Sequence, residues 1–186
     1  MGVSGYSDKM NSHLCKFGLY LKAVRTAPSI DMPQWLLAAK CEIVATNLRK
    51  IELGQTQPGV MLAIRLLHAV GVDVGESLFR LAKQEQLISD GYPAKIPFKF
   101  TDENILAGQS DLCPFGPLYK EVRLCTETSQ KNAAEFAKYN LRNMLEVEAG
   151  RREPGVMTAL SLVCATGCDI SIFFDELSRR SGVVSR

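Results

Sequence analysis

Pro58-Gly59-Val60-Met61 occurs a second time in this sequence, as Pro154-Gly155-Val156-Met157, 96 residues further along the chain. The match continues without a gap in both directions, and 15 of the 50 positions from Gln34 to Lys83 are identical to their counterparts. A period of 96 residues is too long for a solenoid unit of roughly 20 to 50 residues. The sequence therefore predicts a duplicated domain.

The segment between the two copies has a different character from either of them. It is rich in proline and glycine and contains no long helical stripe of apolar residues. We therefore predict a first domain over residues 10–88, an irregular linker over 89–114 and a second domain over 115–186. Residues 94–100 alternate partly between apolar and polar side chains, so the linker is expected to hold a short strand.

Apolar residues at three- and four-residue spacing predict five helices in the first copy. The first helix should end before Pro28, and Asp31 should cap a short second helix. A third helix is expected over about residues 44–53, a fourth over 58–70, and Asp73 should cap the fifth.

The second copy repeats this pattern, with Ser129 and Asn140 as the expected caps of its second and third helices. The predicted class is all-α, with two tandem five-helix domains. In each copy two short helices joined by a tight turn are held by three others, which is the arrangement of a helix-turn-helix domain.

The overall charge and the cysteine and histidine content limit the partners and metal sites that the sequence can indicate. The 22 basic and 20 acidic residues leave a net charge of +2, too near balance to indicate a partner. The balance differs along the chain: the first copy has nine basic against six acidic residues, and the second has ten against nine. Six cysteines without a C-x-x-C pair, and only two histidines, provide no zinc set, so we expect free thiols, no metal and no cofactor.

No catalytic constellation is recognisable in the sequence, so we expect that the protein is not an enzyme. The sequence has no signal-peptide pattern and no apolar run of about 20 residues, and a cytoplasmic location is expected.

Each copy contains Glu-x-Gly-x-x-x-Pro, at Glu52–Pro58 and Glu148–Pro154, with a glutamine eighteen residues before the glutamate, Gln34 or Gln130. Together with the apolar helix that follows, this pattern resembles the Cro and phage-repressor family, the XRE-type helix-turn-helix domains. The resemblance implies a prokaryotic or phage-like, nucleoid-associated transcriptional regulator that binds double-stranded DNA sequence-specifically, with repression favoured over activation. Two copies would occupy adjacent half-sites one helical turn apart, with the linker setting the spacing.

The resemblance also implies roles for individual residues. Arg25 should pair with Glu52, and Arg123 with Glu148, as structural ion pairs. DNA contacts are expected from the glutamine that starts the second helix, from the outer face of the third helix and, in the second copy, from the loop after it. These expected DNA-binding residues are Gln34, Ala45, Thr46, Asn47, Arg49, Lys50, Gln130, Asn140, Arg142, Asn143, Arg151 and Arg152.

The chemistry of the side chains on the two third helices indicates which DNA bases they would contact. Arg142 suits guanine, Asn47 or Asn143 suits adenine, and Ala45 or Leu141 suits the thymine methyl group.

An alternative interpretation stays open, because Val44, Ala45, Leu141 and Leu145 give the third helices few hydrogen-bonding groups and Glu146 would repel phosphates. In that case the chain is a protein-interaction module derived from a helix-turn-helix, comparable to an anti-activator or antitoxin, with weak or no DNA binding. A homodimer is also possible: the apolar run 172–174 forms either an interface or the core of the last helix.

Overall fold

The computed structural model describes residues 15–89 and 112–183, and these residues confirm the predicted all-α class. They form ten helices, five in each copy, with one isolated β-bridge and no strand. We call residues 15–89 the first repeat and residues 112–183 the second repeat. The first repeat contains α2 (Lys16–Arg25), α3 (Gln34–Lys40), α4 (Ala45–Glu52), α5 (Val60–Val70) and α6 (Val74–Gln84). The second repeat contains α7 (Phe115–Cys125), α8 (Gln130–Phe136), α9 (Leu141–Glu148), α10 (Val156–Thr166) and α11 (Ile170–Arg180).

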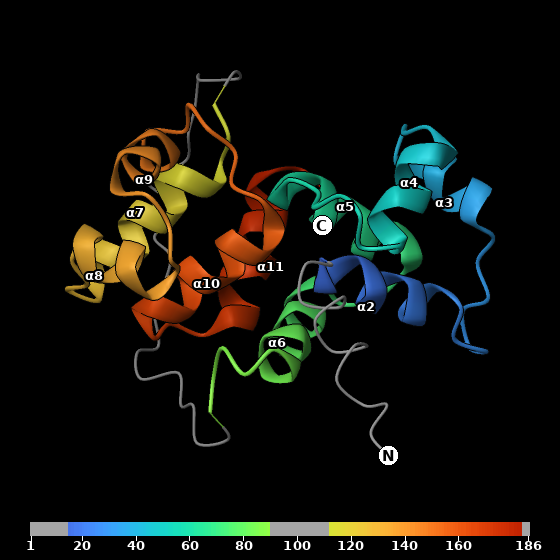
Figure 1. Ribbon diagram of the computed structural model, residues 1–186, viewed down its shortest axis with the longest axis horizontal. Helices are drawn as coiled ribbons and strands as arrows, with labels where there is room; N and C mark the ends of the chain where they lie inside the picture. The colour runs from blue at the N-terminus through green and yellow to red at the C-terminus, as the bar shows by residue number, and fades with distance from the viewer. Residues whose placement is uncertain (1–14, 90–111, 184–186) are drawn as a thin grey trace, which may run out of the picture.

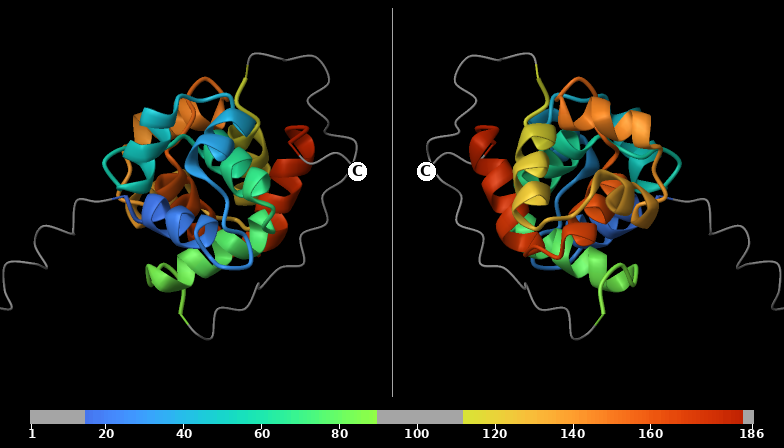
Figure 2. Two further views of the ribbon diagram at one scale, coloured as in Figure 1. Left: turned by 90° about the vertical axis from the view of Figure 1, so that its right-hand side faces the viewer. Right: turned by 90° about the vertical axis from the view of Figure 1, so that its left-hand side faces the viewer.

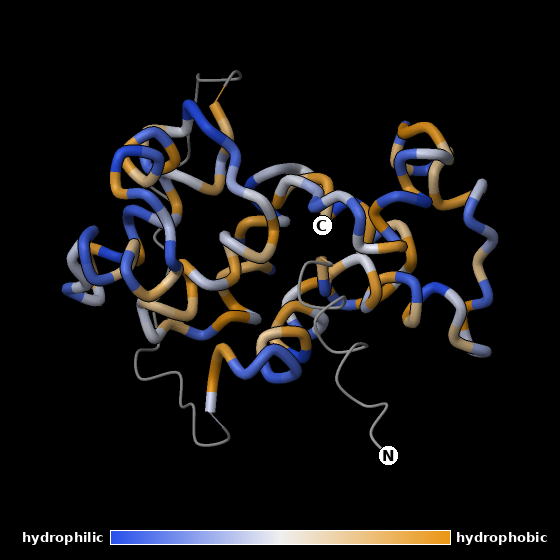
Figure 3. Tube along the Cα trace, viewed as in Figure 1, coloured by the Kyte–Doolittle hydropathy of each residue, from blue (hydrophilic) through white to orange (hydrophobic). Residues whose placement is uncertain are grey.

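The two repeats lie next to each other along the longest axis of the molecule (Figure 1). The α3–α4 pair lies at one end, the α8–α9 pair lies at the other, and α6 and α11 lie between them. The most apolar helices, α5 and α10, are largely orange in Figure 3, whereas α8 is largely blue. Burial of α5 and α10 provides the core that the other helices of each repeat cover.

A glycine lets the first helix of each repeat approach the third very closely. A Cβ atom placed on Gly18 would lie 1.6 Å from the Ile51 carbonyl oxygen, and one on Gly116 would lie 1.7 Å from the Val147 carbonyl oxygen. Both glycines belong to a Cys-x-Phe-Gly sequence that recurs at an offset of 98, because Gly18 corresponds to Gly116. This match lies outside the offset of 96, since the segment from Arg25 to Gln34 is two residues longer than the one from Arg123 to Gln130.

The repeats pair with each other at the Pro-Gly dipeptide that begins the matched motif. The Val60 N–H donates to the Pro154 carbonyl, and the Val156 N–H donates to the Pro58 carbonyl, both at 3.0 Å. These bonds form an antiparallel bridge between Gly59 and Gly155. The two donors, Val60 and Val156, are equivalent residues 96 positions apart, and so are the two acceptors, Pro58 and Pro154. Such reciprocity is the signature of a twofold interface, here made within one chain.

The same relation holds where α6 crosses α11, which is the most extensive helix contact in the described part of the chain. Gly75 faces Ser171, its own counterpart at the offset of 96, and a Cβ on Gly75 would lie 2.4 Å from the Ser171 carbonyl oxygen. The Gly75 N–H donates to Asp175 Oδ1 at 3.1 Å. The local twofold axis therefore passes between Gly59 and Gly155 in the bridge, and between Gly75 and Ser171 where the helices cross.

Several local predictions were wrong. Asp31 does not cap the second helix: it has a positive φ of 38°, and α3 begins at Gln34 after an extended Pro33. The fourth helix begins at Val60 and not at Pro58, because the Pro-Gly dipeptide is extended to pair with the other repeat.

The run 172–174 does not provide an apolar dimer surface, since Phe173 and Phe174 are buried in the core and only Ile172 is exposed. Direct contact fixes the placement of the repeats in this structure, so the linker is not needed to set it. The strand predicted over residues 94–100 lies outside the described residues.

Candidate nucleic-acid interface

A buried arginine and glutamate join the first and third helices of each repeat. Arg25 Nε donates to Glu52 Oε1 at 2.5 Å, and a second guanidinium nitrogen donates to Oε2 at 3.0 Å. The corresponding bonds between Arg123 and Glu148 are 2.5 Å and 3.2 Å long. Both pairs expected from the resemblance are formed.

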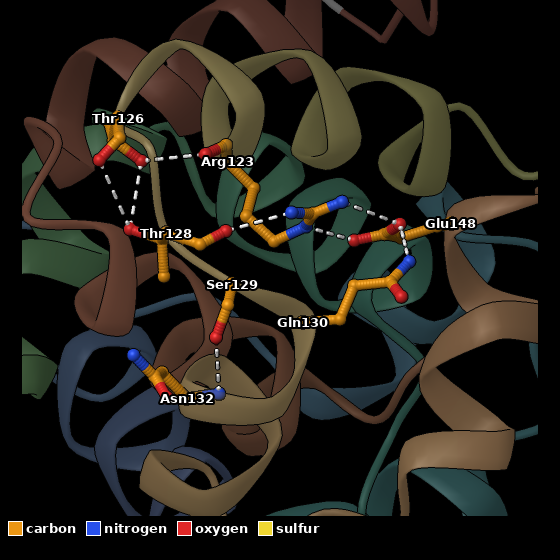
Figure 4. A network of polar contacts seen from close by, with 7 residues as sticks. All are labelled: Arg123, Thr126, Thr128, Ser129, Gln130, Asn132 and Glu148. Carbon is orange, nitrogen blue, oxygen red and sulfur yellow. Dashed lines mark hydrogen bonds and ion pairs between the residues drawn. The ribbon is translucent and has the colours of Figure 1, made fainter.

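The remaining guanidinium nitrogen holds the turn before the second helix. In the first repeat it donates to the Met32 carbonyl at 2.5 Å, and in the second to the Thr128 carbonyl at 2.8 Å. Figure 4 shows this cluster in the second repeat. Because each glutamate is almost fully buried, its charge is compensated by the arginine and not by solvent, and the cluster fixes the position of three elements at once.

Gln34 and Gln130, the expected phosphate or base contacts, are part of the same clusters. The Gln34 side-chain amide donates to Glu52 Oε2 at 2.8 Å, and that of Gln130 donates to Glu148 Oε2 at 2.6 Å (Figure 4). Each glutamine is only half-buried, so one part of it faces outward at the start of α3 or α8. This bridging role was not predicted from the sequence, because the shared spacing of eighteen residues to the glutamate does not specify which groups bond.

The outer face of α4 is exposed and carries positive charge. Its exposed residues include the five that the sequence analysis named on this helix, which are Ala45, Thr46, Asn47, Arg49 and Lys50. The one acidic residue of α4 is Glu52, which is buried in the cluster. Within residues 15–89 and 112–183, neither Arg49 nor Lys50 has an ion-pair partner. This face therefore keeps two cations for an external anion.

On the corresponding face of α9, several polar side chains form hydrogen bonds or ion pairs with groups of the same repeat. Asn140 Oδ1 accepts a bond from the Arg142 N–H at 2.8 Å, so this side chain caps the helix as expected. Arg151 makes two bonds to Glu146, of 2.8 Å and 3.0 Å, and this guanidinium holds the pKa of the Glu146 carboxyl below its usual value. Arg151 therefore already has an anionic partner on α9, while its side chain stays 60% exposed.

Arg152 and Asn143 also contact each other, with 3.3 Å between a guanidinium nitrogen and the amide oxygen. Of the residues expected to bind DNA in the second repeat, Arg142 is exposed, and no carboxylate forms an ion pair with it among the described residues. Leu141 and Leu145, one turn apart, are 45% and 47% exposed. The outer face of α9 thus combines two exposed leucines with Arg142, and its carboxylate, Glu146, is bonded to Arg151.

The two helices lie on the same side of the molecule. In Figure 1 α4 and α9 both lie toward the top, at opposite ends of the long axis, and in the side views of Figure 2 they lie at the same upper corner. This placement follows from the twofold relation between the repeats, which maps α4 onto α9.

The other chemistry-bearing groups serve the fold. All six cysteines are free thiols, and burial raises the pKa of Cys164 to about 12 and that of Cys168 to about 11. In the described ranges no three His, Cys, Asp or Glu side chains gather as a metal site would require. None of the helices described here has the length and apolar character needed to cross a bilayer.

A cavity of about 400 Å³ lies between the repeats, where α5, α6 and α11 meet. It is lined by His68, Val72, Asp73, Val74, Asp175, Ser178 and Arg179. Both of its carboxylates are used within the fold, because Asp73 caps α6 by accepting from the Glu76 N–H and Asp175 accepts from the Gly75 N–H.

Comparisons of the chain with family models, with curated proteins and with solved structures found no match.

Proposed function

We propose that this protein is a sequence-specific double-stranded DNA-binding transcriptional regulator in which each repeat is a helix-turn-helix domain. The observation that carries the proposal is the reciprocal pairing of the repeats, which presents α4 and α9 on one side of a single chain. DNA half-sites that are related by a twofold axis and lie one helical turn apart match a protein with this symmetry.

The local chemistry of the first repeat supports the same function. α4 combines two exposed cations with the exposed Thr46 and Asn47 side chains, so its face offers both phosphate contacts and hydrogen bonds to base edges. The buried cluster beneath it holds α3 and α4 in one geometry, and a fixed geometry lowers the cost of ordering the interface on binding.

Repression is the mode that this architecture favours. A small protein that covers two adjacent half-sites blocks access to a promoter by occupancy alone. The proposal places the protein on the nucleoid in the cytoplasm.

The proposal is tested by selecting bound duplexes from a random DNA pool and measuring their affinity at about 50 and 200 mM salt. We expect enriched sequences with two half-sites about 10 base pairs apart, and a steep loss of affinity at the higher salt. Arg49→Ala combined with Lys50→Ala should weaken binding, whereas Arg80→Ala, an exposed change on α6, should not. Absence of enrichment, with no shifted duplex at low salt, would refute the proposal.

A second candidate function is supported by the exposed apolar side chains of the two helix pairs. Trp35 and Phe136 are 67% and 50% exposed, in addition to the two leucines of α9. An apolar helical face of this kind fits a protein groove. If the chain is a protein-interaction module, a partner recovered by affinity capture should remain bound at high salt, because apolar contacts are screened little by ions.

A further inference from the structure

The twofold relation allows a position-by-position comparison of the two outer faces. Leu141 corresponds to Ala45, Leu145 to Arg49, and Glu146 to Lys50. The two helices lie in equivalent places, so whatever surface α4 meets in one half-site, α9 meets in the other. The faces nevertheless offer different groups: cations and a hydroxyl on α4, and two leucines with one arginine on α9.

Resting on the proposed function, we infer that the second repeat reads a thymine-rich half-site through the methyl groups of its bases, so that the DNA target is not a palindrome. The C5-methyl group of thymine is the one apolar group on the major-groove edges of the bases. Leu141 and Leu145 are one turn apart on α9 and together form an apolar surface that two successive methyl groups can cover.

Desolvation excludes the alternative bases at those positions. A leucine pressed against the edge of guanine, adenine or cytosine would bury a hydrogen-bonding group without a partner, which costs affinity. Burying a thymine methyl group against leucine removes apolar surface from water on both sides. Two of the polar side chains near the leucines are already engaged, since Glu146 is bonded to Arg151 and Asn140 caps the helix. The exposed Arg142 is left for a base or phosphate beside the two thymines.

The outer face of α4 in the first repeat does not require thymine methyl groups in its half-site. Arg49 and Lys50 reach phosphates or base acceptors, and Ala45 is too small to cover more than one methyl group. The target should therefore have two unlike halves, and one chain should bind it in one orientation.

The test uses a duplex selected from the random pool and replaces thymine by deoxyuridine in one half-site at a time. This change removes the methyl group and leaves base pairing intact. We expect an affinity loss of about tenfold when the half-site under α9 is changed, because each methyl group buried on a leucine contributes a few-fold. The same replacement under α4 serves as the control and should change affinity by less than about twofold.

A variant with Leu141→Ala and Leu145→Ala tests the assignment to these side chains. It should bind the thymine and deoxyuridine duplexes equally, while retaining the thermal stability of the parent because both leucines are half-exposed. An equal effect of deoxyuridine in both halves, no effect in either, or a difference that survives in the variant would overturn the inference. In each case DNA binding itself persists, so the proposed function fails only if no duplex is bound. Binding through α4 alone, together with a protein captured on the α9 leucines, would also overturn it.

Discussion

The α3–α4 pair of the first repeat and the α8–α9 pair of the second have the same internal construction and different outer faces. Inside, each is held by an arginine, a glutamine and a glutamate with nearly equal bond lengths. Outside, α4 carries two exposed cations, whereas α9 carries two leucines and a glutamate bonded to the following loop. A duplicated domain can thus keep its scaffold while the surface of each copy changes independently, and the predictions below address these two properties separately.

The largest expected effect comes from breaking the shared scaffold. Glu52→Ala and Glu148→Ala should each destabilise the protein by about 3–5 kcal/mol, because each leaves a buried arginine without its partner. Chemical denaturation measures this loss. Glu76→Ala, which removes an exposed ion pair with Arg80, is the matched control and should leave the denaturation midpoint nearly unchanged. A small effect in either repeat would show that its cluster is not a structural support.

Gly75→Ala tests the contact between the repeats. The added methyl group would meet the Ser171 carbonyl, so we expect a loss of about 1–3 kcal/mol in the free energy of unfolding despite the better helix propensity of alanine. The change lies far from both outer faces, yet it should also weaken binding to DNA with two half-sites. Unchanged affinity for that DNA would indicate that the repeats bind independently of their mutual contact.

Substitutions on the outer faces of α4 and α9 should show how much each helix contributes to DNA affinity and to base preference. Arg142→Ala should lower affinity by about 1–3 kcal/mol and relax the base preference at one half-site only. Arg49→Ala should also reduce the salt dependence of binding if its guanidinium contacts a phosphate. Titrations against duplexes altered in one half-site distinguish a base contact from a phosphate contact. An equal loss of affinity on random DNA would identify Arg142 as a phosphate contact.

The smallest effect is expected from Glu146→Gln, which removes the one carboxylate that stands on the α9 face. Releasing Arg151 should raise DNA affinity several-fold and steepen its salt dependence, bringing the second repeat closer to the first. Because Arg151 lowers the pKa of Glu146, the carboxylate stays ionised at pH 5, and acidification to that pH should not reproduce the gain. Unchanged affinity in the variant would mean that this ion pair lies away from the DNA.

Much of the fold could be predicted from the sequence, because its strongest signals are local. The recurrence of Pro-Gly-Val-Met reveals the duplication without any knowledge of contacts, and the helical spacing and the Arg–Glu positions depend on residues whose partners lie within the same repeat. The contact between repeats could not be predicted in this way. Pro58-Gly59 looks like the start of a helix, and its extended pairing with Pro154-Gly155 depends on a partner nearly 100 residues away.

The candidate site shows the same division. Exposure of the α4 residues follows from helical periodicity, but the bonds that occupy Arg151 depend on a loop conformation that spacing does not specify. Gln34 and Gln130 were identified by position, whereas their bonds to the glutamates became visible only in three dimensions.

The central claim is that the two repeats of one chain present α4 and α9 together to a single DNA duplex. Hydroxyl-radical footprinting on a selected duplex, with the protein-to-DNA stoichiometry measured in parallel, tests it most directly. The account predicts two protected segments on one face of the helix, about 10 base pairs apart, with one chain per duplex. A single protected segment, or two segments that appear only when a second chain binds, would contradict it.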